Sequence, residues 1–347
     1  MQSLQLFKTF LILGFIAFTF SSCNKEEKKE GTKVSGFDAE ILNLSDSTIS
    51  LSSYITPINK IKGKPADFVI SIDVDSNGIF ATPIHVTEGY YIFEYDRNKT
   101  KYFIQVGKKL SLDFDATKPY EKPDYSGKLK YESRYLFDRH LAQSNFRANE
   151  NKYFEYTEKE FVEVVELMRG KMDTMLVMYI ANHPTGSEYF MRQESLTNHY
   201  FMASYLEAYP VKRWSENNDI EPISDSYYTK LNHLNLNDSN AFDNPEFFEY
   251  IQNYIWNRAG APSNEANVIA QIKMVNEQFE IESYQDYLRF KSAKEVALWN
   301  DTESRAHMLD TLIGLINDQG IQRFLVQNIT SDTTSISQIE NKSTEIE

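Results

Sequence analysis

The sequence predicts an α+β fold in which an N-terminal antiparallel β meander or sandwich is followed by an all-α helical domain. Between residues 34 and 115, short apolar runs alternate with turn residues at roughly ten-residue spacing, which is typical of antiparallel strands. After Gly127 the apolar residues recur at helical spacing. We therefore expect a β domain over 34–117, a helical domain over 118–329 and a polar, disordered tail over 330–347.

The β domain is predicted from five apolar runs. Leu110, Leu112 and Phe114 alternate with polar residues, as expected for a strand with one buried face. The other expected strands cover 69–74, 79–80, 90–95 and 102–106. Turns at 75–78 and 107–109 separate them, which favours antiparallel pairing.

The helical domain is predicted from capping signals and apolar stripes. Thr157 and Glu160 have the spacing of a capping box, in which both side chains satisfy free amides of the first turn. The stripe that follows consists of Phe161, Val164, Val165, Met168, Met172, Met175, Leu176, Tyr179 and Ile180. A second helix should start at Asn244-Pro245-Glu246. Further helices are expected over 264–281, 284–299 and 302–317, the last closed near Gly320.

Residues 1–22 have the three parts of a secretory signal peptide. Lys8 supplies the charge, an apolar run follows from Phe10 to Phe20, and Ser21 and Ser22 are the small residues before the cleavage site. The run is about half the roughly 20 residues that a transmembrane helix needs. We therefore expect export and removal of this segment.

Cys23 is the predicted site of lipid attachment. Phe20-Ser21-Ser22-Cys23 resembles the lipobox of bacterial lipoproteins, although that pattern usually has Leu in place of Phe20 and Gly or Ala in place of Ser22. Cys23 is the only cysteine, so no disulfide forms within the chain. The alternative is an unpaired cysteine in an ordinary secreted protein. Residues 23–33 are expected to be a lipidated (palmitate-type), charged tether.

Lys25, Glu26 and Glu27 follow the predicted lipid site directly. They resemble the signal that directs some Gram-negative lipoproteins to the outer face of the outer membrane. We expect an outer-membrane, lipid-anchored and surface-exposed protein. The alternative is a periplasm-facing protein, because any solvated tether is rich in Lys and Glu.

The amino-acid composition limits the classes of binding partner that the protein can have. The formal net charge is −14, and no stripe of Lys and Arg interrupts the acidity, so binding to nucleic acid is disfavoured. The 23 Phe, 22 Tyr and 3 Trp fit packing between helices, with a carbohydrate-stacking platform as the alternative. The expected partners are the membrane, through the lipid, and an envelope protein or a glycan.

The sequence contains no complete catalytic, cofactor-binding or metal-binding constellation, so we assign no such residues and expect no enzyme activity. Asp73 to Gly78 matches the opening of a calcium loop, but Ile84 stands where the bidentate acid belongs, which favours a hairpin turn. No two of the six histidines have metal-ligand spacing on a helix. They are His85, His140, His183, His199, His233 and His307. Walker, dinucleotide-binding and serine-nucleophile motifs are absent.

The chain resembles the N-terminal portion of TlpA-like thiol–disulfide oxidoreductase lipoproteins of Gram-negative envelopes. The matching pieces are residues 72–80, 102–112, Ser126-Gly127 and Tyr135-Leu136. That family carries a C-terminal thioredoxin domain with a C-x-x-C pair, and this chain has no cysteine after Cys23. The resemblance thus implies an accessory region without the redox activity.

Two functions remain open at this stage. The first is a non-catalytic envelope lipoprotein that acts as a binding or docking module. The alternative is a surface glycan- or nutrient-binding lipoprotein, which the aromatic content and the Lys25-Glu26-Glu27 signal favour.

The anchor gives the first testable prediction. Cys23→Ser should abolish labelling by radioactive or clickable fatty acid and should release the protein from the membrane, because the thiol is the acyl acceptor. Labelling that persists in the serine variant would contradict the assignment.

Overall fold

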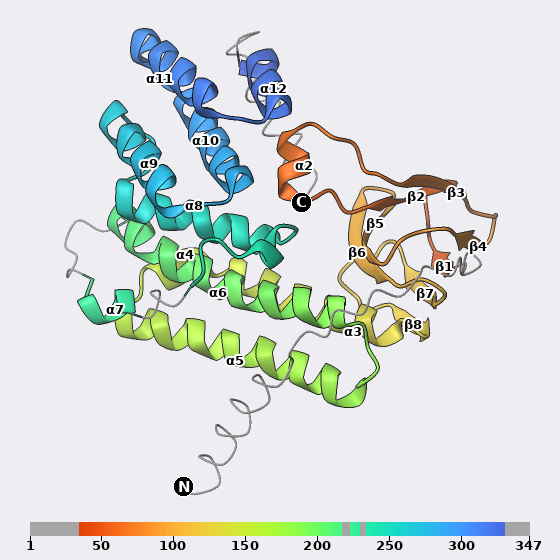
Figure 1. Ribbon diagram of the computed structural model, residues 1–347. Helices are drawn as coiled ribbons and strands as arrows, with labels where there is room; N and C mark the ends of the chain where they lie inside the picture. The colour runs from red at the N-terminus through yellow and green to blue at the C-terminus, as the bar shows by residue number, and fades with distance from the viewer. Residues whose placement is uncertain (1–34, 217–222, 230–233, 330–347) are drawn as a thin grey trace, which may run out of the picture. The chain divides into compact units, whose positions relative to one another are not determined.

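The structure is a computed structural model that describes residues 35–216, 223–229 and 234–329 (Figure 1). In this part of the chain, two four-stranded sheets come first and a helical region follows, so the predicted α+β class is confirmed. The predicted signal peptide, lipid site, tether and polar tail, together with His233, lie outside the described residues.

The strands form two sheets whose inner faces meet. One sheet has the order β4 (Ile79–Ile84), β1 (Ser35–Leu42), β7 (Lys109–Asp115) and β8 (Asp124–Gly127). The other has the order β3 (Val69–Asp73), β2 (Thr48–Ser53), β5 (Gly89–Tyr95) and β6 (Asn98–Ile104). Rings from both sheets pack between them; the centroids of Phe37 and Phe93 are 5.2 Å apart.

The sandwich differs from the sequence prediction in three details. Strands β1 and β7 pair in parallel, and every other strand pair is antiparallel. Strands β1 and β2 lie within the predicted β domain, but the apolar runs do not mark them individually. The predicted end of the β domain, at residue 117, lies before β8. Because β8 pairs with β7, it belongs to the sandwich.

The turn over 75–78 connects β3 in one sheet to β4 in the other, so it is not a hairpin turn. Asp75 Oδ1 accepts hydrogen bonds from the amides of Asn77 (2.9 Å) and Ile79 (2.8 Å). Gly78 has φ +78°, and an added Cβ would lie 2.0 Å from the Ile41 carbonyl oxygen. The pattern that resembles a calcium loop therefore serves the turn: the carboxylate holds the backbone and glycine permits the close approach.

The first helices are α3 (Lys130–Arg147), α4 (Glu150–Phe154), α5 (Glu158–Asn182), α6 (Glu188–Glu216) and α7 (Asp225–Thr229). Both hydrogen bonds of the capping box between Thr157 and Glu160 are present at the start of α5. Most of the predicted stripe of α5 is buried, but Ile180 is exposed.

The remaining helices are α8 (Pro245–Ala259), α9 (Glu265–Gln278), α10 (Glu282–Val296), α11 (Thr302–Leu315) and α12 (Gln319–Ile329), preceded by a 3₁₀ turn at Ser239–Ala241. The Asn244 side chain caps α8 by accepting the Glu246 amide at 3.0 Å. Gly320 lies in the first turn of α12 and does not close α11, which corrects the prediction.

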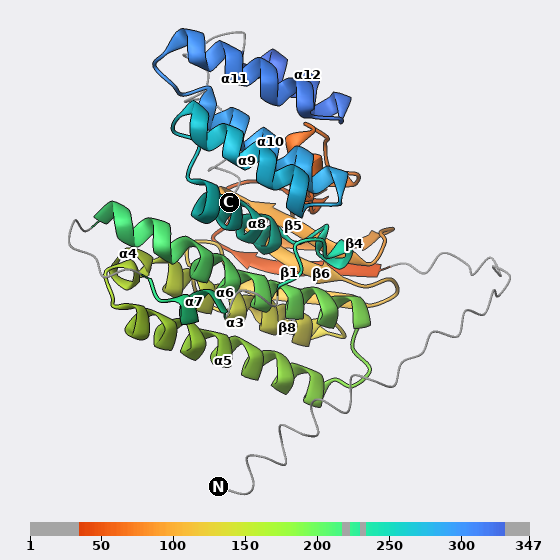
Figure 2. The same cartoon turned by 60° about the vertical axis from the view of Figure 1, so that its left-hand side comes forward.

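A short helix in the β region, α2 (Pro57–Ile61), connects β2 to β3 and was not expected. Its buried Ile58 and Ile61 belong to the apolar core of the C-terminal helices. Figures 1 and 2 show that the strands β5 and β6 lie against the helical region. The sheets and helices are therefore joined both through α2 and through β5 and β6.

Within the described ranges, no helix combines the length and the apolar character needed to cross a membrane.

Candidate functional site

Strand alternation places two kinds of side chain on β6. Tyr102 and Ile104 point into the sandwich core, and Phe103, one residue out of phase, packs against the helices with its ring centroid 4.9 Å from that of Phe190. Lys101 is in phase with Phe103 and faces the same side. On β5, the paired strand, Tyr90 lies opposite Phe103.

A buried polar network holds this face of the sheet against α3 and α6. The Tyr90 hydroxyl donates to Glu194 Oε1 at 2.6 Å, and Arg139 Nε lies 2.7 Å from Glu194 Oε2. The Arg139 and Glu194 side chains are only 8% and 1% exposed. Burial, and then the Glu194 charge, raise the pKa of Tyr90, so its hydroxyl remains a donor. A buried carboxylate requires such partners, because desolvation penalises the unpaired charge.

Other contacts fix the rim beside this network. Ser187, which caps the start of α6 by accepting the Phe190 amide, donates a short hydrogen bond to Glu88. Asn244 Nδ2 donates to Thr197 Oγ1 at 3.1 Å, which joins the start of α8 to α6. These polar contacts hold the segment before β5 and the start of α8 against α6.

A cleft of about 150 Å³ lies between the β region on one wall and α6 with the start of α8 on the other. We call it the Lys101 cleft. The β region contributes aromatic and cationic side chains, and the helical region contributes mainly amides, a hydroxyl and a carboxylate. The side chains that define the cleft are Tyr54, Tyr90, Tyr91 and Lys101 on one wall and Tyr189, Gln193, Thr197, Asp243 and Asn244 on the other.

Lys101 supplies the positive charge of the cleft. Its Nζ lies 4.2 Å from the ring centroid of Tyr90 and 4.5 Å from that of Tyr54. Within the described residues, no carboxylate approaches Nζ closely enough to form an ion pair. Burial, and then repulsion by Arg139, lower the pKa of Lys101 to about 8. The ammonium is therefore desolvated with aromatic faces as its close neighbours.

Asp243 supplies a negative charge on the opposite wall. It precedes the capping residue of α8, and burial raises the pKa of its carboxyl. Burial, and then the Asp243 charge, raise the pKa of Tyr189, and both side chains line the cleft. Among the described residues, Asp243 forms no ion pair with Lys101.

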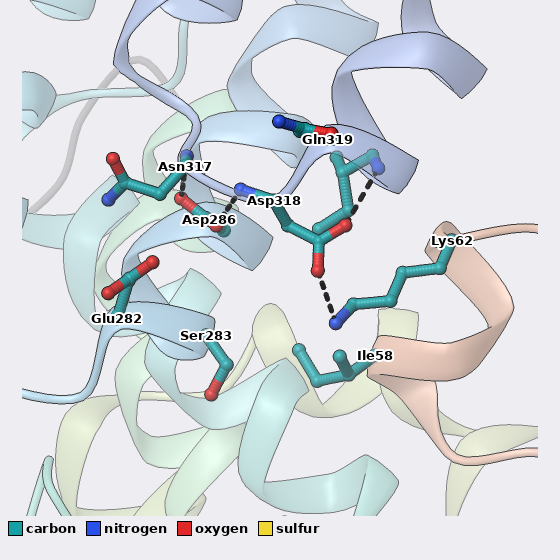
Figure 3. Close-up of a pocket in the computed structure, with 9 residues that line it drawn as sticks. Ile58, Lys62, Glu282, Ser283, Asp286, Asn317, Asp318 and Gln319 are labelled. Atoms are coloured by element: carbon teal, nitrogen blue, oxygen red, sulfur yellow. Dashed lines mark hydrogen bonds and ion pairs between the residues drawn. The ribbon is translucent and has the colours of Figure 1, made fainter.

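A larger groove of about 500 Å³ lies where α2 meets α10 and the start of α12 (Figure 3). Lys62 Nζ lies 2.5 Å from Asp318 Oδ2, and the other oxygen of Asp318 accepts the Gly320 amide at 2.8 Å. Asp286 accepts the amides of Asn317 (3.0 Å) and Asp318 (2.9 Å). These acids hold α2 and the start of α12 in place, so we regard the groove as a structural junction and not as the principal site.

Sequence reasoning did not identify the Lys101 cleft. The site residues that the sequence predicts lie outside the described part of the chain; they are Cys23, Lys25, Glu26 and Glu27. Over the described residues, no group of three or more His, Cys, Asp or Glu side chains is arranged to hold a metal ion. One signal was available: Lys101 is a charged residue in phase with Phe103 on a strand whose two faces both carry large apolar side chains.

The chain was compared with known protein families, with curated proteins and with solved structures, and none of them matches it. The resemblance to TlpA-like lipoproteins therefore stays a prediction.

Glu246, near the cleft, gives a prediction about pH. Its carboxylate lies 3.2 Å from Arg147 Nη2, and burial raises its pKa to about 7 despite that cation. The folded state therefore holds a proton between about pH 4.5 and 7 that the unfolded state releases, so this group makes stability fall as pH rises through that window. Glu246→Gln should remove up to about 3 kcal/mol of that fall.

Urea unfolding at pH 5 and pH 7.5 measures the effect. Glu163→Gln, which changes an exposed acid on α5, is the control and should keep the wild-type difference between the two pH values. An unchanged pH dependence in Glu246→Gln would show that Glu246 is ionised throughout.

Proposed function

We propose that this protein is a non-catalytic binding module of the cell envelope, anchored to the outer membrane by lipid on Cys23, and that it binds a small polar solute in the Lys101 cleft. The observation that carries the proposal is the Lys101 ammonium, which is desolvated and has no ion-pair partner within the described residues.

The Lys101 charge carries a cost in free energy because it is partly removed from water. A buried ammonium without an anionic partner destabilises the folded state unless it changes protonation or gains a partner. A ligand that brings a polar or anionic group would offset this cost. Ligand sites are commonly concave, partly aromatic and equipped with a few convergent polar groups, and the cleft has these features.

This geometry favours solute binding, the nutrient- or glycan-binding alternative, over protein docking. Tyrosine faces can pack against the apolar side of a sugar or an amino acid while their hydroxyls accept or donate hydrogen bonds. Display on the cell surface, as the tether residues Lys25, Glu26 and Glu27 suggest, would suit capture of nutrients. A periplasm-facing position would suit hand-over of a solute within the envelope.

Protein docking is the second candidate, because α5 exposes apolar side chains. Leu167 is 76% exposed, and Val177 and Met178 are each 59% exposed. Apolar side chains gathered on one helix can mark a contact site for a partner. This role would agree with the accessory region of the TlpA-like lipoproteins.

A thermal-denaturation screen of the full chain in detergent tests solute binding. The panel contains monosaccharides, small organic acids, amino acids and short peptides. At least one compound should raise the melting temperature, since a ligand at 100 times its dissociation constant stabilises the folded state by about 2.7 kcal/mol.

Two matched variants test whether the rise in melting temperature comes from binding in the cleft. Gly89 lines the cleft and Gly170 lies on exposed α5; an added Cβ meets no atom within 4 Å at either position. Gly89→Phe should abolish the shift, whereas Gly170→Phe should retain it. A panel without effect on the wild type, or a shift that survives in Gly89→Phe, would contradict the proposal.

A further inference from the structure

The Lys101 cleft contains one charge of each sign, carried by opposite walls. The ammonium of Lys101 comes from β6, and the carboxylate of Asp243 comes from the segment before α8. Each is partly removed from water, and burial shifts each pKa toward the neutral form. Within the described residues they form no ion pair with each other or with another side chain.

We propose that the Lys101 cleft binds a zwitterion of amino-acid size, whose carboxylate pairs with Lys101 and whose ammonium pairs with Asp243. This inference rests on the proposed function, solute binding in the same cleft, and it specifies the ligand class. The two ligand charges complement the two protein charges, so neither half-buried side chain stays without a partner.

The volume of the cleft supports a small ligand. The volume of the cleft is about 150 Å³, less than a third of that of the groove beside α2. This space suits one amino acid and is too small to enclose an oligosaccharide or a long peptide. The Tyr54, Tyr90 and Tyr189 side chains line the same space and offer ring faces to an aliphatic or aromatic side chain of the ligand.

Simpler ligand classes leave at least one of the two protein charges without a counter-charge. A neutral sugar would give hydrogen bonds to both charges but no compensating charge to either. A carboxylate without an amine would pair with Lys101 and would add repulsion at Asp243. An amine without a carboxylate would do the reverse. The chemistry of the two walls therefore selects for both groups in one molecule.

The inference is tested by calorimetric titration of the full chain in detergent with the common L-amino acids, one at a time. Lactate serves as the probe with a carboxylate alone, ethanolamine as the probe with an amine alone, and glucose as the neutral probe. We expect at least one amino acid to bind and the three other probes to bind at least about tenfold more weakly, since a lost contact to a charged group costs about 10- to 100-fold.

Two charge-removing variants complete the test. Lys101→Met and Asp243→Asn should each weaken amino-acid binding by about 10- to 100-fold. Both variants remove a desolvated charge, so both should fold, and circular dichroism checks this. Glu163→Gln on α5 removes an exposed charge elsewhere and should leave binding unchanged.

The outcomes separate this inference from the proposed function. If lactate or glucose binds as tightly as any amino acid and Asp243→Asn has no effect, the cleft is a solute site but the zwitterion inference is wrong. If no probe binds and the wider panel of the thermal screen is also without effect, the proposed function itself is wrong.

Discussion

The arrangement of the protein depends on one buried carboxylate, Glu194 on α6. The Tyr90 hydroxyl on β5 donates to its Oε1 at 2.6 Å, and Arg139 Nε on α3 lies 2.7 Å from its Oε2 as an ion pair. Removing Arg139 would leave the Glu194 charge buried without its counter-ion, which typically costs about 3–5 kcal/mol, roughly a third or more of the stability of a domain. The network therefore fixes the position of one sheet relative to two helices, and the Lys101 cleft exists because that position is fixed.

The charged residues of the groove and of the Lys101 cleft differ in their structural roles. Asp286 accepts two backbone amides, and Asp318 accepts a backbone amide and pairs with the Lys62 ammonium. Their charges therefore hold α2 and the start of α12 in place. Lys101 and Asp243 have no such role within the described residues. A fold that pairs Glu194 with Arg139 and leaves the two charges of the cleft without an ion pair among the described residues has a candidate binding site at those two charges. This contrast makes the smaller cleft the better candidate than the larger groove.

Much of the fold could be predicted from local sequence patterns. The alternation at Leu110, Leu112 and Phe114, the capping box at Thr157 and the start of α8 at Asn244 each depend on neighbouring residues, and all are present. The parallel pairing of β1 with β7 and the docking of α2 on the C-terminal helices depend on residues far apart in sequence. The cleft was missed for the same reason: Lys101 and Asp243 are brought together only by the packing of sheet and helices.

The most direct test of this account is the pKa of Lys101, measured by isotope-edited NMR of the lysine side chains and assigned with Lys101→Arg. An ammonium desolvated between Tyr54 and Tyr90 without an ion-pair partner should titrate near 8, well below the ordinary value of 10.5. A bound amino acid should raise that pKa, because its carboxylate favours the charged form. Titration of Lys101 together with the exposed lysines would contradict the account, since it would show a solvated side chain and an open cleft.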